Sequence, residues 1–220
     1  NTFEGGVAVN FGTLSLPVNG ALPANGGKLS LTEATSSPTE AGDLNLATSV
    51  RDANGTAYEI QTLGNSSSPS GTDGLFGLDK TNAHRLKVTG LYLPPNVKRI
   101  GKRAFLSCLN LAGPLCLPEA VTLYKYAFSS CSNVTAVVFK GSTAGGQVFD
   151  TNGYQFENCV RLAGELDLPD NNTSVPSYCF SHTALTRLSA PNATKVGASA
   201  FSTCSKLTRV ELSDGVTSLG

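Results

Sequence analysis

The 220-residue sequence has no methionine, no tryptophan and only two histidines. His84 and His182 lie far apart, and neither has a cysteine, histidine or aspartate partner at the spacing of a metal site. The chain also lacks a G-x-S-x-G elbow, a phosphate-binding loop and an H-E-x-x-H motif. We therefore expect no catalytic residue, no bound metal and no cofactor.

An excess of charge of one sign is missing too. Lysine plus arginine and aspartate plus glutamate number 16 each, so the formal net charge is zero. A nucleic-acid partner would normally require a basic stripe, which the sequence does not show, and we predict no such partner. Because no apolar run reaches the length of a membrane-spanning helix, this segment is predicted not to be transmembrane. The start at Asn1, without methionine or a signal peptide, indicates a mature or trimmed product whose leader has been removed.

The sequence does contain an internal repeat between Leu91 and Leu212. A phenylalanine recurs after 23, 28, 24 and 21 residues, as Phe105, Phe128, Phe156, Phe180 and Phe201. A period in this range is typical of a solenoid, because so small a unit cannot bury its own apolar face and must stack on a neighbour.

Each unit opens with an apolar-x-apolar triplet and a proline, as in Leu91-Tyr92-Leu93-Pro94. Side chains alternate along a strand, so Leu91 and Leu93 are predicted to face the core and Tyr92 the solvent. An Ala-Phe pair then begins a short turn or helical segment, whose ring fills the space between coils. A small residue follows each phenylalanine after three positions, and stacking would align these residues into a ladder: Cys108, Cys131, Cys159, Thr183 and Cys204.

This order of features resembles the BspA-like family of leucine-rich repeats, which combines an (L/V)x(L/I)P strand, an Ile-Gly step and an AFxxC turn. The matching features, such as Ile100-Gly101, Ala104-Phe105 and Cys108, recur between Thr89 and Gly220. The resemblance implies a leucine-rich repeat solenoid of about five and a half units, with short parallel strands and short helical or 3-10 turns. It also implies an exported protein, displayed on the cell surface or extracellular.

Residues 1–88 contain no cysteine and no recognisable copy of this repeat. Short alternating runs predict strands at Val7–Phe11, Leu14–Leu16 and Leu29–Leu31. Asp43–Thr62 has the pattern of a β-hairpin with its turn at Asp52–Gly55. We predict a β-rich N-terminal domain or cap over residues 1–88 and leucine-rich repeats over 89–220, and the sequence leaves open which of the two forms the first part takes.

The chain ends at Leu219-Gly220, which matches the Ile-Gly step of a sixth unit. The Ala-Phe pair that should come next does not follow. We therefore expect a fragment of a longer array, and a neighbouring molecule that covers the open end is the alternative.

All six cysteines lie between positions 108 and 204, and an even number in an exported protein is compatible with disulfides. The ladder cysteines, however, recur because the repeat recurs, and a small buried residue that stacks on its own copies behaves as an apolar group. We therefore favour free thiols. Cys116 differs, because it takes the outward position of its strand.

A solenoid presents one continuous surface along its strands, so outward strand positions are the best candidates for binding. Aromatic and arginine side chains are enriched at interfaces, which favours Tyr92, Arg187 and Arg209. The alternative is that these are simply solvated strand residues. The Gly-rich insertion Lys140–Gly153 is a second candidate, since long loops on repeats often carry function. The complete set of predicted binding residues is Tyr92, Val138, Asp167, Arg187, Arg209 and Glu211.

From these observations we predict a non-catalytic, cell-surface or secreted module that recognises a host or cell-surface protein, or a glycan, through its solenoid face, as an adhesin does. The alternative is a structural spacer that holds another domain away from the cell envelope. An enzyme with its site in residues 1–88 is disfavoured, because that segment has one histidine, no cysteine and no pair of acidic residues at a recognisable spacing.

Overall fold

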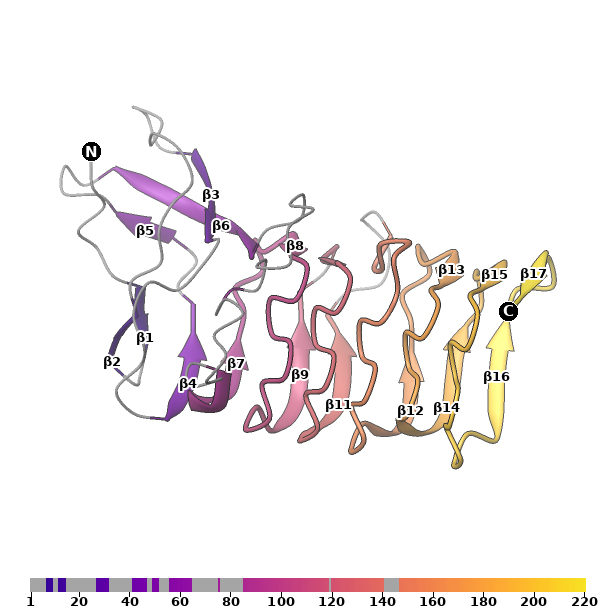
Figure 1. The fold of residues 1–220 in the computed structure, drawn as a ribbon. Coiled ribbons are helices and arrows are strands. Elements are labelled where there is room, and N and C mark those ends of the chain that lie inside the picture. Colours follow the sequence, from indigo (N-terminus) through magenta and orange to yellow (C-terminus); the bar gives the residue numbers. More distant parts are fainter. Residues whose placement is uncertain are drawn as a thin grey trace.

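The chain folds as a row of stacked coils, each of which contributes one strand to each of two parallel rows (Figure 1). Among the residues that the structure describes, no helix is long and apolar enough to cross a membrane. The computed structural model describes residues 7–9, 12–14, 27–31, 41–46, 49–51, 56–64, 75, 85–118, 120–140 and 147–220.

The longer strands form the first row, and its outward side is called the strand face below. They are β4 (Gly42–Asn45), β7 (Val88–Tyr92), β9 (Gly113–Leu117), β11 (Val134–Phe139), β12 (Ala163–Asp167), β14 (Ala184–Ala190) and β16 (Arg209–Leu212). Pairing is parallel, β4 with β7, β9 with β11, and β12 with β14 and then β16. Parallel pairing follows from the solenoid, because every coil passes this face in the same direction.

The second row contains the predicted Ile-Gly steps. Its strands are β6 (Ala57–Leu63), β8 (Arg99–Ile100), β10 (Thr122–Leu123), β13 (Ser174–Val175), β15 (Lys195–Val196) and β17 (Ser218–Leu219). Each of the first five ends in a buried apolar residue, which fixes the inward side of the step. Four neighbouring pairs along this row are hydrogen-bonded, and all four are parallel: β6 with β8, β8 with β10, β13 with β15, and β15 with β17.

The third unit, which lacks a recognisable step in the sequence, uses the end of its insertion instead. Phe149 forms a parallel bridge with Leu123 and so takes the place of the missing step. Its ring, 2% exposed, lies edge-on to Phe156 and Phe180 at centroid distances of 6.4 and 5.8 Å. Val148 is also buried. These two apolar residues of the insertion therefore belong to the core, whereas residues 141–146 lie outside the described part.

The phenylalanine ladder runs through the core in register. Ring centroids of successive coils are 5.1, 5.6, 5.8 and 6.1 Å apart, and each pair is parallel to within 4°. Four of the rings are fully buried, and Phe201 in the last coil is partly buried. This confirms the predicted solenoid: one large ring per coil fills the same space and makes dispersion contacts with its own copies.

The Ala-Phe segments are successions of turns, and the 3-10 helix of the described residues, η1 (Arg85–Lys87), lies elsewhere. In the coil of Phe105, Arg103 and Ser107 both have a φ of 57°. The left-handed φ angles at these two positions turn the backbone, so that N–H groups of the same turn reach different acceptors. The Phe105 N–H donates to a carbonyl of the next coil (2.8 Å), whereas the Cys108 N–H donates back to the Phe105 carbonyl (3.3 Å). The turns are therefore bonded to their neighbours as strands are, which a helix could not achieve.

The ladder cysteines use their thiols within the stack. Cys131 Sγ donates to the Phe105 carbonyl (3.0 Å) and Cys204 Sγ to the Phe180 carbonyl (2.9 Å), each in the preceding coil. Thr183, at the ladder position of its coil, donates its hydroxyl to Phe180 as well (2.8 Å). All six cysteines are free thiols, which confirms the prediction.

Strands before residue 88 continue both rows. β4 pairs with β7, where Leu44 lies opposite Leu91, and β6 pairs with β8 through Thr62 and Leu63. The strands β4 and β6 therefore stack on the first coil that the sequence pattern identifies. Whether residues 1–88 form an independent domain or a cap stays a prediction.

The predicted hairpin is confirmed only in its second half. β5 (Ser49–Arg51) pairs antiparallel with β6, and the turn at residues 52–55 lies outside the described residues. The first arm was expected to begin at Asp43, and this part is wrong: residues 42–45 form β4, which pairs in parallel with β7, and Leu44 is buried there. Two of the predicted strands overlap β1 (Val7–Val9) and β3 (Gly27–Leu31). The strand β2 (Gly12–Leu14) shares only Leu14 with the predicted run Leu14–Leu16, whose other residues lie outside the described part.

Candidate functional site

All six predicted binding residues lie on the strand face, at outward positions of β7, β11, β12, β14 and β16. Tyr92 is 58% exposed and Val138 is 48% exposed, which is unusual for large apolar side chains in this molecule. The other four, all charged, lie in the last three coils. The face thus has an apolar part near β7 to β11 and a charged part from β12 onward.

The hydrogen-bonded sheet of the strand face is interrupted between β7 and β9. A single bond, from the Ala112 N–H to the Thr89 carbonyl (2.9 Å), joins the two segments at one end, and β7 and β9 form no ladder. Two features of β9 explain the break. Gly113 has a φ of 81°, which turns the peptide planes at the start of the strand, and Pro114 has no N–H to donate.

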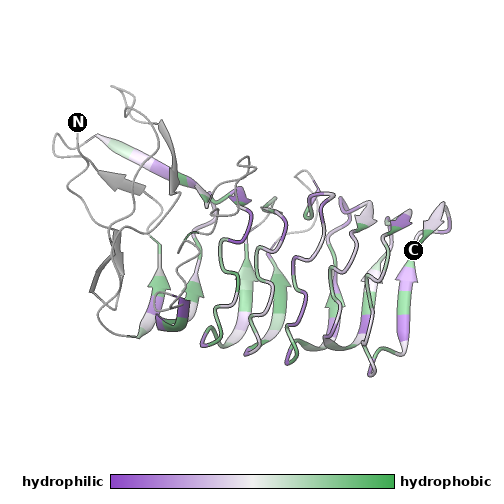
Figure 2. Cartoon of the chain, viewed as in Figure 1, coloured by the Kyte–Doolittle hydropathy of each residue, from purple (hydrophilic) through white to green (hydrophobic). Residues whose placement is uncertain are grey.

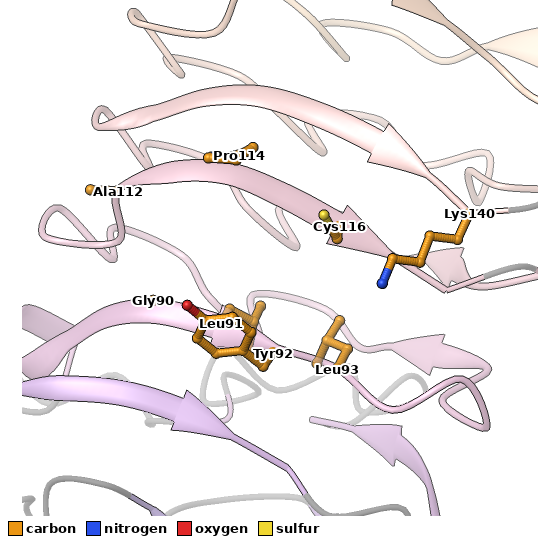
Figure 3. A pocket seen from close by; sticks show the side chains of 8 residues that line it. All are labelled: Gly90, Leu91, Tyr92, Leu93, Ala112, Pro114, Cys116 and Lys140. Atoms are coloured by element: carbon orange, nitrogen blue, oxygen red, sulfur yellow. The ribbon is translucent and has the colours of Figure 1, made fainter.

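A pocket of about 250 Å³ lies at this break. Figure 3 shows Tyr92 on β7 and Cys116 on β9 on either side of it, with the Lys140 side chain extending from the end of β11 toward the space between them. The lining is mostly apolar with one cation, as in many sites that hold a partner side chain. Its residues are Gly90, Leu91, Tyr92, Leu93, Ala112, Pro114, Cys116 and Lys140.

The charged part of the face is a cluster of five side chains around Arg187. The Arg187 guanidinium lies 3.2 Å from Glu165, 2.9 Å from Asp167 and 2.7 Å from Glu211. Arg209 also contacts Glu211, at 2.8 Å. Three carboxylates against two guanidinium groups leave one negative charge, and the Glu165 and Asp167 side chains are largely exposed.

Hydrogen bonding within this cluster shifts two ionisation equilibria. The bond from Arg187 lowers the pKa of the Glu211 carboxyl, helped by Ser189 and by the charge of Arg209. The same bond to Glu211 raises the pKa of Arg187, with Asp167 adding to the effect. Both groups are therefore fully charged at neutral pH, and the cluster holds the two arginine side chains in place on the face.

The predicted residues fall into two groups that the fold keeps apart. Tyr92 and Val138 belong to the apolar part, and the arginines and carboxylates to the charged part. Sequence reasoning did not predict that Lys140, which follows β11, would line the same pocket as Tyr92 of β7. The pair Gly113-Pro114, in a strand otherwise rich in apolar residues, was the signal that could have located the break.

Buried thiols and one histidine are further titratable groups of the described residues. Burial raises the pKa of the Cys131, Cys159 and Cys179 thiols, so these groups stay protonated and make poor nucleophiles. His182 Nδ1 lies 2.8 Å from the Ser181 hydroxyl. Across the described ranges, no group of three or more histidine, cysteine or acidic side chains could hold a metal. His84 lies outside these ranges.

A model of the BspA-type leucine-rich repeat region matches the chain in six copies, over residues 83–153 and 147–220. Among solved structures, the chain is similar to a leucine-rich cell surface protein from Faecalibacterium prausnitzii, with 22% identity and a TM-score of 0.55 over 88% of this chain. The match spans 52% of that protein, so the chain corresponds to about half of its length.

A second similar structure is a leucine-rich repeat protein from Bacteroides ovatus, with 14% identity and a TM-score of 0.31, covering 96% of this chain and 78% of that one. No curated protein matches the chain. The first structure supports the fold, and the family model accounts for more than half of the sequence.

Proposed function

The chain belongs to the BspA-type leucine-rich repeat family, and on this premise we propose that it is a non-catalytic binding module that recognises a protein partner through its strand face. The observation that carries the proposal is the pocket at the break between β7 and β9, beside the exposed ring of Tyr92. A partner bound there would insert an apolar side chain into the pocket and pack against the tyrosine.

The two parts of the strand face would contribute differently to binding. Interfaces draw most of their affinity from a few aromatic or apolar anchors, which fits the pocket and its neighbour Val138. The charge cluster, where Asp167, Arg187, Arg209 and Glu211 are already paired, would mainly orient the partner and exclude partners of the wrong charge.

The proposed location is the cell surface or the extracellular space. It is supported by the family and by the similar Faecalibacterium structure, which is described as a cell surface protein. A non-catalytic role is supported by the family's repeat scaffold. A glycan in place of a protein as the partner of the strand face is a variant of this proposal.

A structural spacer is the second candidate, and one observation favours it. The Arg187 guanidinium is paired with three carboxylates of its own chain. A rigid surface whose charged groups already pair with each other would have this arrangement. Under this function, substitutions on the strand face would leave the activity of the larger protein unchanged, whereas deletion of one coil would alter it.

The test is binding of the purified chain to immobilised extracellular-matrix proteins and mucins. In the binding function, Tyr92→Ala lowers the affinity for the retained partner by at least about tenfold, the size expected for an aromatic anchor. Cys116 offers an independent probe, because its exposed thiol lines the pocket: a bulky maleimide on Cys116 should abolish binding to the same degree.

Two controls separate pocket filling from general damage. Val160→Ala removes a side chain that is 53% exposed in the turn before β12 and does not line the pocket, and should leave affinity unchanged. The variant Cys116→Ser, treated with the same maleimide, should resist the block. If no matrix protein or mucin is retained, or if Tyr92→Ala and Val160→Ala behave alike, the binding function is wrong and the spacer gains support.

A further inference from the structure

The net charge of the whole chain is zero, but one segment has only positively charged side chains. Residues 85–118 contain no acidic side chain, although the chain as a whole has as many acids as bases. The same segment contains six basic residues: Arg85, Lys87, Lys98, Arg99, Lys102 and Arg103. Arg85 is buried, so the others determine the charge that this coil presents to solvent.

Four of these cations lie at the end of the coil that faces away from the strand face. Lys98 and Arg99 are exposed at β8, which is strongly hydrophilic in Figure 2, and Lys102 and Arg103 begin the turn that follows. The next coil adds Lys125, whose carbonyl accepts the Arg103 N–H at 3.0 Å. Neighbouring coils thus place five cations along one edge, where β8 passes into the turns.

A stripe of stacked tyrosines continues from these cations along the turns. Tyr126, Tyr154 and Tyr178 occupy equivalent positions in three successive coils, and their ring centroids are 4.7 Å apart at both steps. The cations are in contact with the stripe: Arg103 lies 5.5 Å from the Tyr126 centroid, and Lys125 lies 5.1 and 5.0 Å from those of Tyr126 and Tyr154. All three rings are half-buried, so their outer edges face solvent.

We propose that this edge, called here the basic–tyrosine face, binds a linear acidic glycan that carries sulfate or carboxylate groups. The cations would pair with the anionic groups, and the row of phenol edges would bond to sugar hydroxyls. An extended glycan chain repeats with a rise close to the spacing between coils, so it could follow the stack.

A nucleic acid is the other polyanion to consider, and the ring geometry disfavours it. Proteins that bind single strands present aromatic faces on which bases stack. Here the tyrosines pack on each other, with angles of 36° between Tyr126 and Tyr154 and 9° between Tyr154 and Tyr178, so that they expose edges instead of faces. Edges with hydroxyl groups suit a ligand that is rich in hydroxyls.

The experiment measures binding of the full chain to a heparin oligosaccharide, to polygalacturonate and to a duplex DNA of similar charge. We expect the chain to bind at least one of the two glycans more tightly than the DNA, with an affinity that falls as salt concentration rises. The double variant Lys98→Glu and Arg99→Glu should lower glycan affinity by at least about tenfold.

The matched control is Lys195→Glu with Lys206→Glu, which changes the net charge equally. Lys195 occupies in β15 the position that Arg99 occupies in β8, and both control lysines are exposed in the last coils. The control variant should retain glycan binding, and so should Tyr92→Ala, which tests the separate strand-face function. Absence of glycan binding at moderate salt, equal losses in the two double variants, or tighter binding to DNA would each overturn the proposal.

Discussion

The interior ladder and the strand face differ in how strictly the sequence repeats from coil to coil. Inside, five successive coils repeat the same side chain, and the phenylalanine rings remain parallel at 5.1 to 6.1 Å. Outside, the outward strand residue changes in kind from coil to coil, from Tyr92 through Val138 to Asp167. Repetition is required only where a coil must pack on its copy. Positions that break the repeat are therefore free to encode binding.

The largest effect should come from breaking the ladder in its middle. Phe156→Ala removes a fully buried ring that stacks on Phe128 and Phe180, and should lower the free energy of unfolding by about 3–5 kcal/mol. The cavity would lie between coils on both sides, where neither neighbour can collapse into it. Denaturant unfolding followed by circular dichroism measures the change.

The matched control for this variant is Phe201→Ala. Phe201 stacks on one ring only and is partly buried, so its removal should cost clearly less than removal of Phe156. Equal costs at both positions would show that the stack does not act as a chain of nearest-neighbour contacts, as a solenoid requires.

Two glycines allow the same comparison between a position packed against the next coil and a position that faces open space. Gly153 and Gly113 both have positive φ, of 77° and 81°. A Cβ at Gly153 would collide with the Ser177 carbonyl of the next coil, whereas one at Gly113 would meet open space. Gly113→Ala should therefore cost only the backbone term of about 1–2 kcal/mol, and Gly153→Ala about 2–4 kcal/mol, because a backbone must also move.

Thermal and denaturant unfolding of the two glycine variants provide the measurement. If both variants lose the same stability, the close approach of neighbouring coils at Gly153 is not important for the stack. Gly113→Ala has a second readout, since this glycine lies at the break beside the pocket: its effect on binding can be compared with its effect on stability.

Most of the fold could be predicted from the repeat in the sequence. The spacing of the phenylalanines, the ladder cysteines and the strand triplets were enough to predict stacking, because each reports a contact with its own copy. Two features were hidden. Leu44-Asn45-Leu46 and Leu63-Gly64 stack as an earlier coil, but no phenylalanine or cysteine follows them in the pattern. Phe149 replaces a step that the sequence lacks.

The candidate surfaces were less predictable. Alternation along each strand correctly placed Tyr92 and Arg187 outward, since it depends on local geometry alone. The pocket depends on where the sheet opens, and the basic–tyrosine face depends on which coils lie side by side. Lys125 and Arg103 are 22 residues apart in the sequence and become neighbours only through the stack. Average charge over the chain could not reveal either surface.

The smallest effect concerns the charge cluster of the strand face and its dependence on pH. The bond from Arg187 lowers the pKa of Glu211 in the folded state, so the carboxylate stabilises the fold above its unfolded pKa of about 4.3 and loses that contribution as pH falls through the lower, folded value. Glu211→Gln removes the titrating group. The variant should therefore be slightly less stable than the parent at pH 7 and equally stable at the acid end, as measured by denaturant midpoints from pH 3 to 7.

The background Arg187→Met isolates the cause of this effect. Without the guanidinium, Glu211 loses the main interaction that lowers its pKa, and Glu211→Gln should then have a stability effect that does not vary with pH. If, with Arg187 present, the stability difference between Glu211→Gln and the unmodified chain stays the same from pH 3 to 7, the side chains of the cluster are solvated and do not interact. The strand face would then lack the fixed charged part that distinguishes it from the uniform interior.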